Sequence, residues 1–442
     1  MRVTRPQEGG VNYHQQRWRS GSIHVTLNPW IARAVRVSGS VLLAVCGVIQ
    51  PALSQTQYPI AVDADLSPLS AGVALLTLQR GAAELEDRIL VPRPFHERRA
   101  LGFTYRFGKL ILLDLPQDEL LAVVNHEVFG HGYRFRELGL KGISYEIKAP
   151  APYGTGGGSA SYEASDRPLG PAELMAIEVA GIEAGNVAAQ ALALRAVGRS
   201  AIHYREATAY LVSILDGVSY VMSARDRTEV SGDDVADFLI DLNAANGGVA
   251  APLRAQSLKR RALVAFANPM IAYAGYAVFV SYLGHGRPFT RIPSIRLGSN
   301  VRYLPWFRFQ MTPYGTEWIS DHTLARATSV LSVSVRSGNA RTMRTVGAEV
   351  QMVNVVVTDR IAVNAAGELW RQPALEEILP GSRPRPRVGG LATGTVMISA
   401  FGSARSAASV LLQAGFKSAG FTAGERLPGG AIVRVGLAVR GR

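Results

Sequence analysis

The sequence predicts an α+β protein in which a helical N-terminal part is followed by an antiparallel β-barrel or β-meander of about eight strands. Two observations support this prediction. Between residues 115 and 286, apolar residues recur with the helical period of about 3.6 residues. From about Arg291 onward, short stretches alternate between apolar and polar residues, as in strands with one apolar face. With 442 residues, 48% of them hydrophobic, the chain can bury a sizeable core.

These patterns divide the chain into four segments. We expect an N-terminal extension with a signal peptide over residues 1–54 and a linker with the start of the helical domain over 55–114. The helical domain proper is expected over 115–286, and the antiparallel β domain over 290–442.

The N-terminal segment has the features of an export signal. Arg33 and Arg36 precede an apolar run over 41–49, and residues 52–54 match a small-x-small cleavage pattern. The run is shorter than the about 20 apolar residues that a membrane-spanning helix needs, although an uncleaved anchor is an alternative. We therefore expect an exported protein of a bacterial cell envelope, in the outer membrane or periplasm.

Five helices are expected in the helical region, and the last is the most apolar. Its sequence is long enough to cross a bilayer, but Pro269 interrupts it near its start because proline lacks the amide donor of a regular helix. A central buried helix and a transmembrane helix are both open interpretations. The five expected helices cover residues 116–138, 170–197, 203–225, 232–246 and 254–284.

The C-terminal region resembles a small outer-membrane β-barrel in its alternation and in its aromatic residues. Trp306, Trp318 and Trp370 fall near expected strand ends, where membrane barrels place aromatic girdles. This resemblance implies that the β domain contacts a membrane, and a soluble β-sandwich is the alternative. The clearest alternating stretches are 328–335, 347–357, 360–364, 395–400 and 432–439.

Charge and cysteine content exclude several classes of protein. The net charge of +13 is not accompanied by a basic run interleaved with aromatics or by zinc-finger spacing, so we expect no nucleic-acid partner. The single cysteine, Cys46, excludes an intramolecular disulfide and a cysteine-based zinc site.

The chemistry is concentrated in the first expected helix. His126 and His131 lie five residues apart, and Glu127 directly follows the first histidine. Zinc in catalytic sites binds neutral imidazoles and a carboxylate and leaves a position for water. A neighbouring glutamate can take a proton from that water.

The spacing of the two histidines requires a distorted helix. Residues five apart on an ideal α-helix lie about 140° apart around its axis, so His126 and His131 could not reach one ion. A π-bulge widens one turn and removes this conflict, and Gly130 would ease the distortion. The sequence therefore predicts a bulged helix over 127–131.

The run from His126 to His131, His-Glu-Val-Phe-Gly-His, is similar to the His-Glu-x-x-Gly-His signature of the dipeptidyl-peptidase III type of zinc metallopeptidase. The resemblance covers this motif only. It implies one zinc ion bound by His126 and His131, and the family's fold is not carried over, although we expect the helical domain to be zincin-like. It also implies that Glu127 is the general base and that a glutamate from a later helix is the third ligand.

The third ligand is expected on the helix over 170–197. Glu183 and Glu178 stand among Ala, Ile, Val and Gly, and a carboxylate buried there must be paired, protonated or metal-bound. We favour Glu183, with Glu178 as the alternative. The small residues Ala180 and Gly181 would allow this helix to approach the motif helix closely.

These observations predict an exported zinc-dependent hydrolase, most simply a peptidase acting on peptides or proteins, with Glu127 as general base. The alternative function is a non-enzymatic outer-membrane β-barrel whose helical part is a plug or scaffold. Two further interpretations of the motif are open. Glu127 and His131 could bind a metal without His126, or the motif residues could make hydrogen bonds only.

Overall fold

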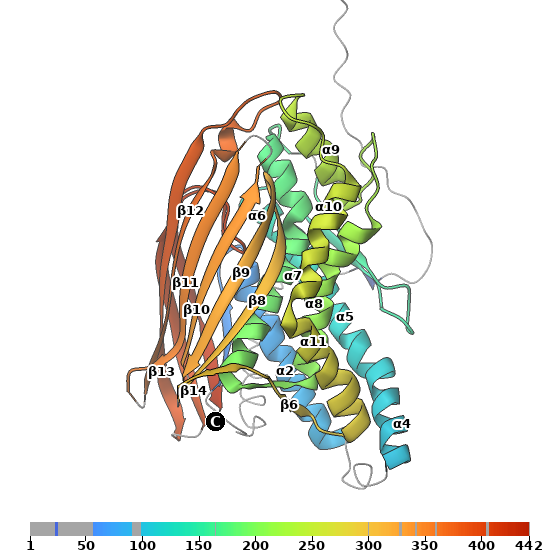
Figure 1. The fold of residues 1–442 in the computed structure, drawn as a ribbon, viewed down its shortest axis with the longest axis vertical. Helices are drawn as coiled ribbons and strands as arrows, with labels where there is room; N and C mark the ends of the chain where they lie inside the picture. Colours follow the sequence, from blue (N-terminus) through green and yellow to red (C-terminus); the bar gives the residue numbers. More distant parts are fainter. Residues whose placement is uncertain are drawn as a thin grey trace, which may run out of the picture.

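A computed structural model describes residues 23–24, 56–90, 99–163, 165–298, 300–326, 329–340, 343–358, 360–403 and 406–441. Apart from β1 (Ile23–His24), the expected extension and signal peptide over 1–54 lie outside the described residues. A large antiparallel sheet forms one side of the molecule and a group of helices forms the other (Figure 1). The predicted combination of helices and an antiparallel sheet is therefore confirmed.

The large sheet is a meander, as predicted. Its order is β2-β15-β14-β13-β12-β11-β10-β9-β8-β7, so the eight long strands from β8 to β15 pair in chain order. One edge strand comes from the start of the described chain, because β2 pairs with β15. The strands are β2 (Thr56–Val62), β7 (Ile295–Leu297), β8 (Val301–Thr312), β9 (Gly315–Arg326), β10 (Ser329–Asn339), β11 (Arg344–Val356), β12 (Ile361–Pro373), β13 (Pro386–Ser403), β14 (Ser406–Lys417) and β15 (Gly430–Gly441).

The five helices predicted from periodicity are confirmed with closely similar bounds. The motif helix consists of α5 (Leu115–Val124), η3 (Asn125–His131) and α6 (Gly132–Glu137). Three long helices follow, α7 (Pro171–Arg199), α8 (Tyr204–Ser223) and α9 (Asp234–Asn246). The last comprises α10 (Ala255–Ala262), η4 (Leu263–Ala267), α11 (Pro269–Gly275) and η5 (Tyr276–Gly284). The segment expected as a linker also holds η1 (Pro68–Gly72), α2 (Val73–Leu90), α4 (Arg99–Lys109) and η2 (Leu110–Asp114).

The apolar helix over 255–284 bends where the sequence predicts an interruption. The side chain of Asn268 accepts a hydrogen bond from the Met270 amide and so begins α11 afresh. Among the described helices, none is by itself long and apolar enough to cross a membrane. The pair Ala255–Ala267 and Pro269–Gly284, bent by 64°, meets the length and composition of a span when taken together.

Helix α7 is the centre of the molecule. It packs against α8, α9 and η3 on one side and against β8, β9 and β10 on the other. One apolar cluster joins Leu192 and Tyr210 of the helices to Trp306 of the sheet. A second joins Met175 to Phe309. The helices and the sheet therefore share their cores, and α7 holds the motif helix in place.

Two small sheets complete the fold. β3 (Ser144–Ile147) is flanked by β1 and by β4 (Gly158–Ser161), so β4 is an edge strand. β5 (Ala201–His203) pairs with β6 (Phe289–Arg291).

Candidate metal centre

The motif helix contains the distortion that the histidine spacing predicts. Residues Asn125–His131 form a π-helical segment, η3, between α5 and α6. A π-turn closes hydrogen bonds between residues five apart and so brings such residues onto one face. The imidazole rings of His126 and His131 accordingly lie with their centroids 5.0 Å apart.

Glycines allow η3 to lie against the backbone of α7. A Cβ at Gly130 would stand 2.7 Å from the carbonyl oxygen of Ala180, and a Cβ at Gly181 would stand 2.1 Å from Nε2 of His126. Both distances are shorter than any real contact of a Cβ. The close approach expected from Ala180 and Gly181 is therefore present, and it fixes the ring of His126.

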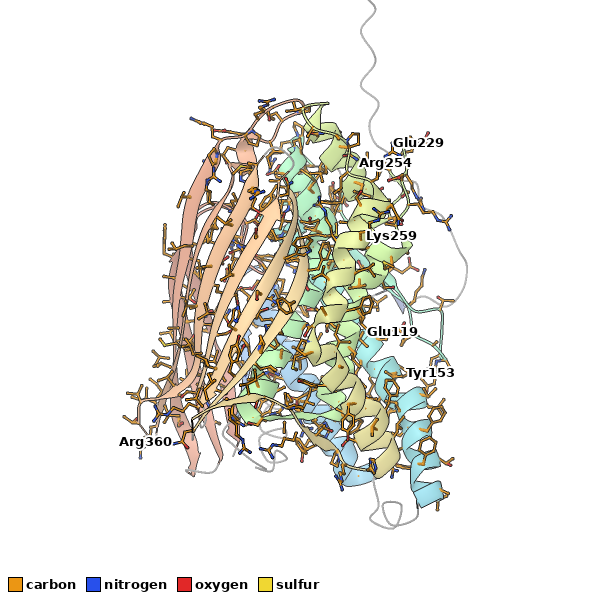
Figure 2. All side chains as sticks on the ribbon, in the orientation of Figure 1. Glu119, Tyr153, Glu229, Arg254, Lys259 and Arg360 are labelled. Carbon is orange, nitrogen blue, oxygen red and sulfur yellow. The ribbon has the colours of Figure 1, made fainter. Side chains whose placement is uncertain are left out.

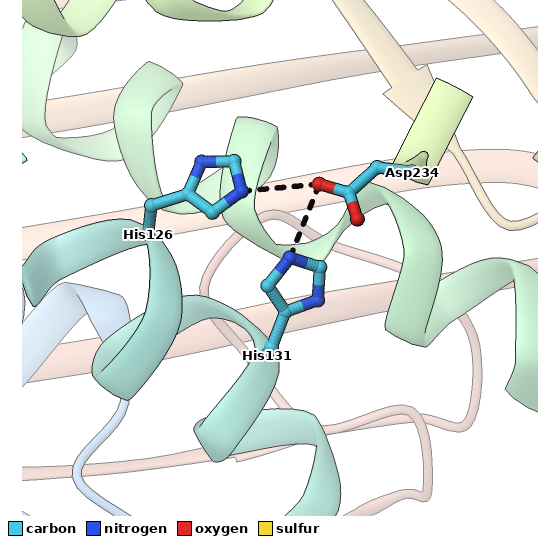
Figure 3. Close-up of side chains that lie close together, drawn as sticks. All are labelled: His126, His131 and Asp234. Carbon is cyan, nitrogen blue, oxygen red and sulfur yellow. Dashed lines mark hydrogen bonds and ion pairs between the residues drawn. The ribbon is translucent and has the colours of Figure 1, made fainter. Parts of the chain in front are cut away.

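Both motif histidines point at one carboxylate oxygen (Figure 3). Oδ2 of Asp234, the first residue of α9, lies 3.1 Å from Nε2 of His126 and 3.2 Å from Nε2 of His131. The three candidate ligand atoms all lie within 4.8 Å of one another. These three residues are the group in the described chain that could hold a metal ion.

The hydrogen bonds of the two Nδ1 atoms determine whether each Nε2 atom directs a proton or a lone pair at Asp234. Nδ1 of His131 lies 2.8 Å from the carbonyl oxygen of Ile177, and Nδ1 of His126 lies 3.0 Å from Oδ2 of Asp216. Each partner is an acceptor, so each Nδ1 carries the proton. A neutral imidazole then directs the lone pair of Nε2 at Asp234, which is the second-shell arrangement of histidines that bind metals.

Two of the three separations between candidate ligand atoms match those around a small divalent ion. A tetrahedral ion with ligand bonds of about 2.0–2.2 Å separates its ligand atoms by about 3.3 Å. The distances of 3.1 and 3.2 Å from Asp234 to the two nitrogens are close to this value. Without a cation, two lone pairs and a carboxylate would repel one another unless the rings took up protons.

When no metal is bound, the alternative is that the two imidazole rings are protonated, and the electrostatics of the site favour this. Burial opposes the charged form of His126, but Asp216 and Asp234 outweigh this and hold its pKa well above the usual value. Burial also opposes protonation of His131, and Asp234 raises its pKa nevertheless. Burial would raise the pKa of Asp234, but the two histidines lower it. The centre therefore holds protons or a cation.

Glu127 lies beside this group but does not belong to it. Its side chain is buried, and burial raises the pKa of its carboxyl, with partial compensation from His131 and His126. The strand β4 covers it, because a Cβ at Gly158 would stand 2.9 Å from Cγ of Glu127. The group that could hold a metal contains both histidines and excludes Glu127. This differs from the interpretation in which Glu127 and His131 bind without His126.

Glu183, the favoured third ligand, lies elsewhere on α7. It is 1% exposed and accepts two hydrogen bonds from Nη2 of Arg134, at 2.7 and 2.8 Å. Its Oε1 also accepts from the amide of Gly424 at 2.6 Å. Burial raises the pKa of the Glu183 carboxyl, and Arg134 offsets part of this effect. The structure therefore places Glu183 in a satisfied ion pair and not at the two histidines.

Glu178, the alternative third ligand, also faces other groups. Burial and the neighbouring carboxylate of Asp241 hold the pKa of Glu178 well above the usual value. It follows Ile177, whose carbonyl contacts His131, but it is not among the three residues whose ligand atoms converge.

Sequence reasoning missed Asp234 and Asp216. Asp234 follows Asp233, whose side chain accepts from the Ala236 amide as the N-cap of α9, so an aspartate pair at this position resembles ordinary capping. Asp216 offered a better signal, because it is the only charged residue in the apolar stretch from Ala209 to Met222. A lone carboxylate in the middle of a buried helix requires a partner.

Comparisons of the chain with protein-family models, with curated proteins and with solved structures found no match. The support for a functional interpretation comes from the geometry of the site.

Proposed function

We propose that this protein is an exported metal-dependent hydrolase whose centre is formed by His126, His131 and Asp234. The observation that carries the proposal is the convergence of two imidazole Nε2 atoms on Oδ2 of Asp234, with both Nδ1 atoms engaged by acceptors. Two histidines and one carboxylate are a ligand set of hydrolytic zinc sites. We propose one zinc ion per chain.

In the proposed reaction, the residues around the centre have separate roles. Zinc, when bound, supplies a Lewis acid that activates water at neutral pH. Asp216 and Ile177 orient the two imidazoles through their Nδ1 atoms. Glu127 accepts a proton and returns it to the leaving group, and the raised pKa of its buried carboxyl suits this task.

A peptide is the proposed substrate because an unpaired strand edge lies at the site. β4 is the edge of its sheet, and its residue Gly158 contacts Glu127. An extended peptide can add to such an edge through main-chain hydrogen bonds. The partly exposed side chains of Asp216 and Asp234 leave the centre accessible from solvent.

Metal analysis and one isosteric variant test this proposal. Purified protein should contain about one zinc per chain, and His131→Ala should lose it, as measured by elemental analysis. Glu127→Gln should keep the metal and lose cleavage of a peptide library. If folded wild-type protein offered zinc binds none, the proposal is wrong. Stoichiometric iron in place of zinc would also overturn it, because a two-histidine, one-carboxylate set also serves iron oxygenases.

The second candidate is a non-enzymatic membrane protein whose helical part supports the sheet. Its specific support is the shared core, in which α7 packs along β8, β9 and β10 and fills the inner side of the sheet. This candidate predicts that His131→Ala retains every property of the wild-type protein apart from local stability.

A further inference from the structure

The outer face of the large sheet is apolar and exposed. On β14, Val410, Leu412 and Phe416 are exposed, and on β15 Val433 and Val435 are exposed. Within each strand the exposed residues are separated by an even number of positions, as expected for residues on one face of a strand. The same face includes Val335, Val346, Val350, Met352, Val396 and Ile398.

The inner face of the same sheet carries buried charges. Arg308 pairs with Asp321 of the neighbouring strand at 2.7 Å, and both side chains are buried. Arg434 pairs with Glu425 at 2.9 Å, also buried. In proteins surrounded by water, charged side chains lie outside and apolar ones inside. In this sheet the exposed outer face is apolar, which is the pattern of strands surrounded by lipid, and the inner face holds these ion pairs beside the apolar clusters shared with the helices.

The helix formed by α4 and η2 has the same inverted arrangement. Among the described side chains of this helix, the charged ones are buried: Arg106 donates to the carbonyl of Leu283 at 2.8 Å, and Lys109 pairs with Asp114 at 2.6 Å. The exposed large side chains that are described here are apolar, namely Leu101, Phe103, Phe107, Ile111 and Leu112.

The segment over 262–284 continues this surface. It contains no charged residue, and its polar residues Asn268 and Ser281 are buried. Phe279 is 62% exposed, although it lies in one of the most apolar parts of the chain. The exposed large residues are Leu263, Val264, Phe266, Tyr276, Phe279 and Val280.

These helices connect the two edges of the sheet. η4 packs against β8 near one edge, and α2 packs against β2 at the other. Between them, η5 packs against α4, and Lys109 of α4 lies 3.5 Å from Glu86 of α2. Figure 1 shows α2, α4 and α11 together on the helical side of the molecule. The apolar surface of the sheet thus continues around the helical side.

We propose that the outer face of the sheet and the exposed faces of α2, α4, η2 and η4–η5 form one belt that contacts the acyl chains of a lipid bilayer. The helices take the place that further strands occupy in a closed barrel. Strands β11, β14 and β15 have 13, 12 and 12 residues, enough for the about 9–11 residues of a membrane-crossing strand. This inference does not depend on the proposed hydrolase.

The charges at one end of the belt match the headgroups of anionic lipids. Within residues 284–302 every Asp, Glu, Lys or Arg position is an arginine, and the sequence of the connection from β11 to β12 contains one acidic and one basic residue, Asp359 and Arg360. Arg360 marks this end in Figure 2, whereas Glu229, Arg254 and Lys259 lie toward the opposite end on the helical side. The exposed arginines are Arg287, Arg291, Arg296, Arg326 and Arg360.

Site-directed fluorescence in vesicles tests the belt. Cys46→Ala gives a cysteine-free background, and single cysteines are then introduced by Phe279→Cys, Leu412→Cys or Glu229→Cys. Each is labelled with a nitrobenzoxadiazole thiol probe after reconstitution into phosphatidylethanolamine–phosphatidylglycerol vesicles. Lipids with a doxyl group in mid-chain should quench the probes at Phe279 and Leu412 alike. The probe at Glu229 should keep its fluorescence.

Three results would overturn the inference. Quenching at Leu412 without quenching at Phe279 would limit lipid contact to the sheet. Absence of quenching at both positions in folded protein would exclude lipid contact, and self-association through the belt that persists in the vesicles would indicate a second copy as its partner. Circular dichroism on each variant detects a folding defect, and zinc content detects a failed metal site. Both can therefore be distinguished from a belt that does not contact lipid.

Discussion

Two carboxylates face the motif helix, Glu183 buried and Asp234 partly exposed, and they differ in what neutralises them. Glu183 meets a guanidinium that is always charged, and a backbone amide completes its hydrogen bonds. Asp234 meets two imidazoles that are charged only if protonated. The first carboxylate is satisfied by the chain itself, whereas the second needs protons or a metal ion. The difference shows that burial alone does not identify a ligand.

We expect the largest effect on metal content, which should differ between variants of the two carboxylates. Asp234→Asn removes the anion at which both Nε2 atoms point, so we expect the stoichiometric metal to be lost. Glu183→Gln should retain the metal, because Glu183 contacts Arg134 and not the histidines. Elemental analysis of both folded variants measures this. Metal loss in folded Glu183→Gln with retention in Asp234→Asn would reverse the comparison.

The second effect concerns stability at the satisfied pair. Arg134→Met leaves Glu183 and Glu137 buried without their cation, and we expect the free energy of unfolding to fall by about 3–5 kcal/mol. Arg167→Met is the matched control, since Arg167 and Glu173 form an exposed pair, with a loss of about 1 kcal/mol or less. Denaturant unfolding measures both. Equal losses would show that the buried ion pair contributes no more to stability than the exposed pair.

A smaller effect is expected from the residue that orients His126. Asp216→Asn weakens the partner of Nδ1, and loss of such a partner costs about 10–100-fold in metal affinity. Calorimetric titration with zinc measures the affinity. Asp166→Asn, at an exposed carboxylate paired with Lys141, should leave it unchanged. An unchanged affinity in Asp216→Asn would mean that the ring of His126 is held by packing alone.

The smallest effect is the pH dependence of the metal-free protein. The raised pKa of His126 and His131 adds stability that is complete below the unfolded value of about 6.5 and is lost as the pH rises through the folded value. The lowered pKa of Asp234 adds stability above its unfolded value of about 3.9, which is lost at lower pH.

The melting temperature of chelator-treated wild type should therefore exceed that of Asp234→Asn most between about pH 4 and 6.5. Thermal unfolding across this range measures the difference. Zinc-loaded wild type should not lose stability as the pH rises above 6.5, because the metal requires neutral imidazoles. A constant difference between wild type and variant at all pH values would contradict the proposed charge state.

Much of the fold follows from local patterns. Helical patterning predicted α7, α8 and α9, although α7 is buried on every side from Val179 to Ala189. Alternation predicted the meander. The pairing of β2 with β15 was not predictable, because it joins residues near opposite ends of the described chain. The resemblance to a membrane barrel implied an outward apolar face of the sheet, whereas alternation by itself shows that two faces differ but not which one faces inward.

The candidate site divides in the same way. The five-residue spacing of His126 and His131 by itself required the π-helical turn, because only a widened turn brings both rings onto one face. The third member of the group depends on which helix the tertiary packing brings to that face. Glycines at 130 and 181 let α7 approach the motif helix, yet Glu183 turns to Arg134, and α9 supplies Asp234. Sequence sets which groups are available, and three-dimensional packing decides which charges meet.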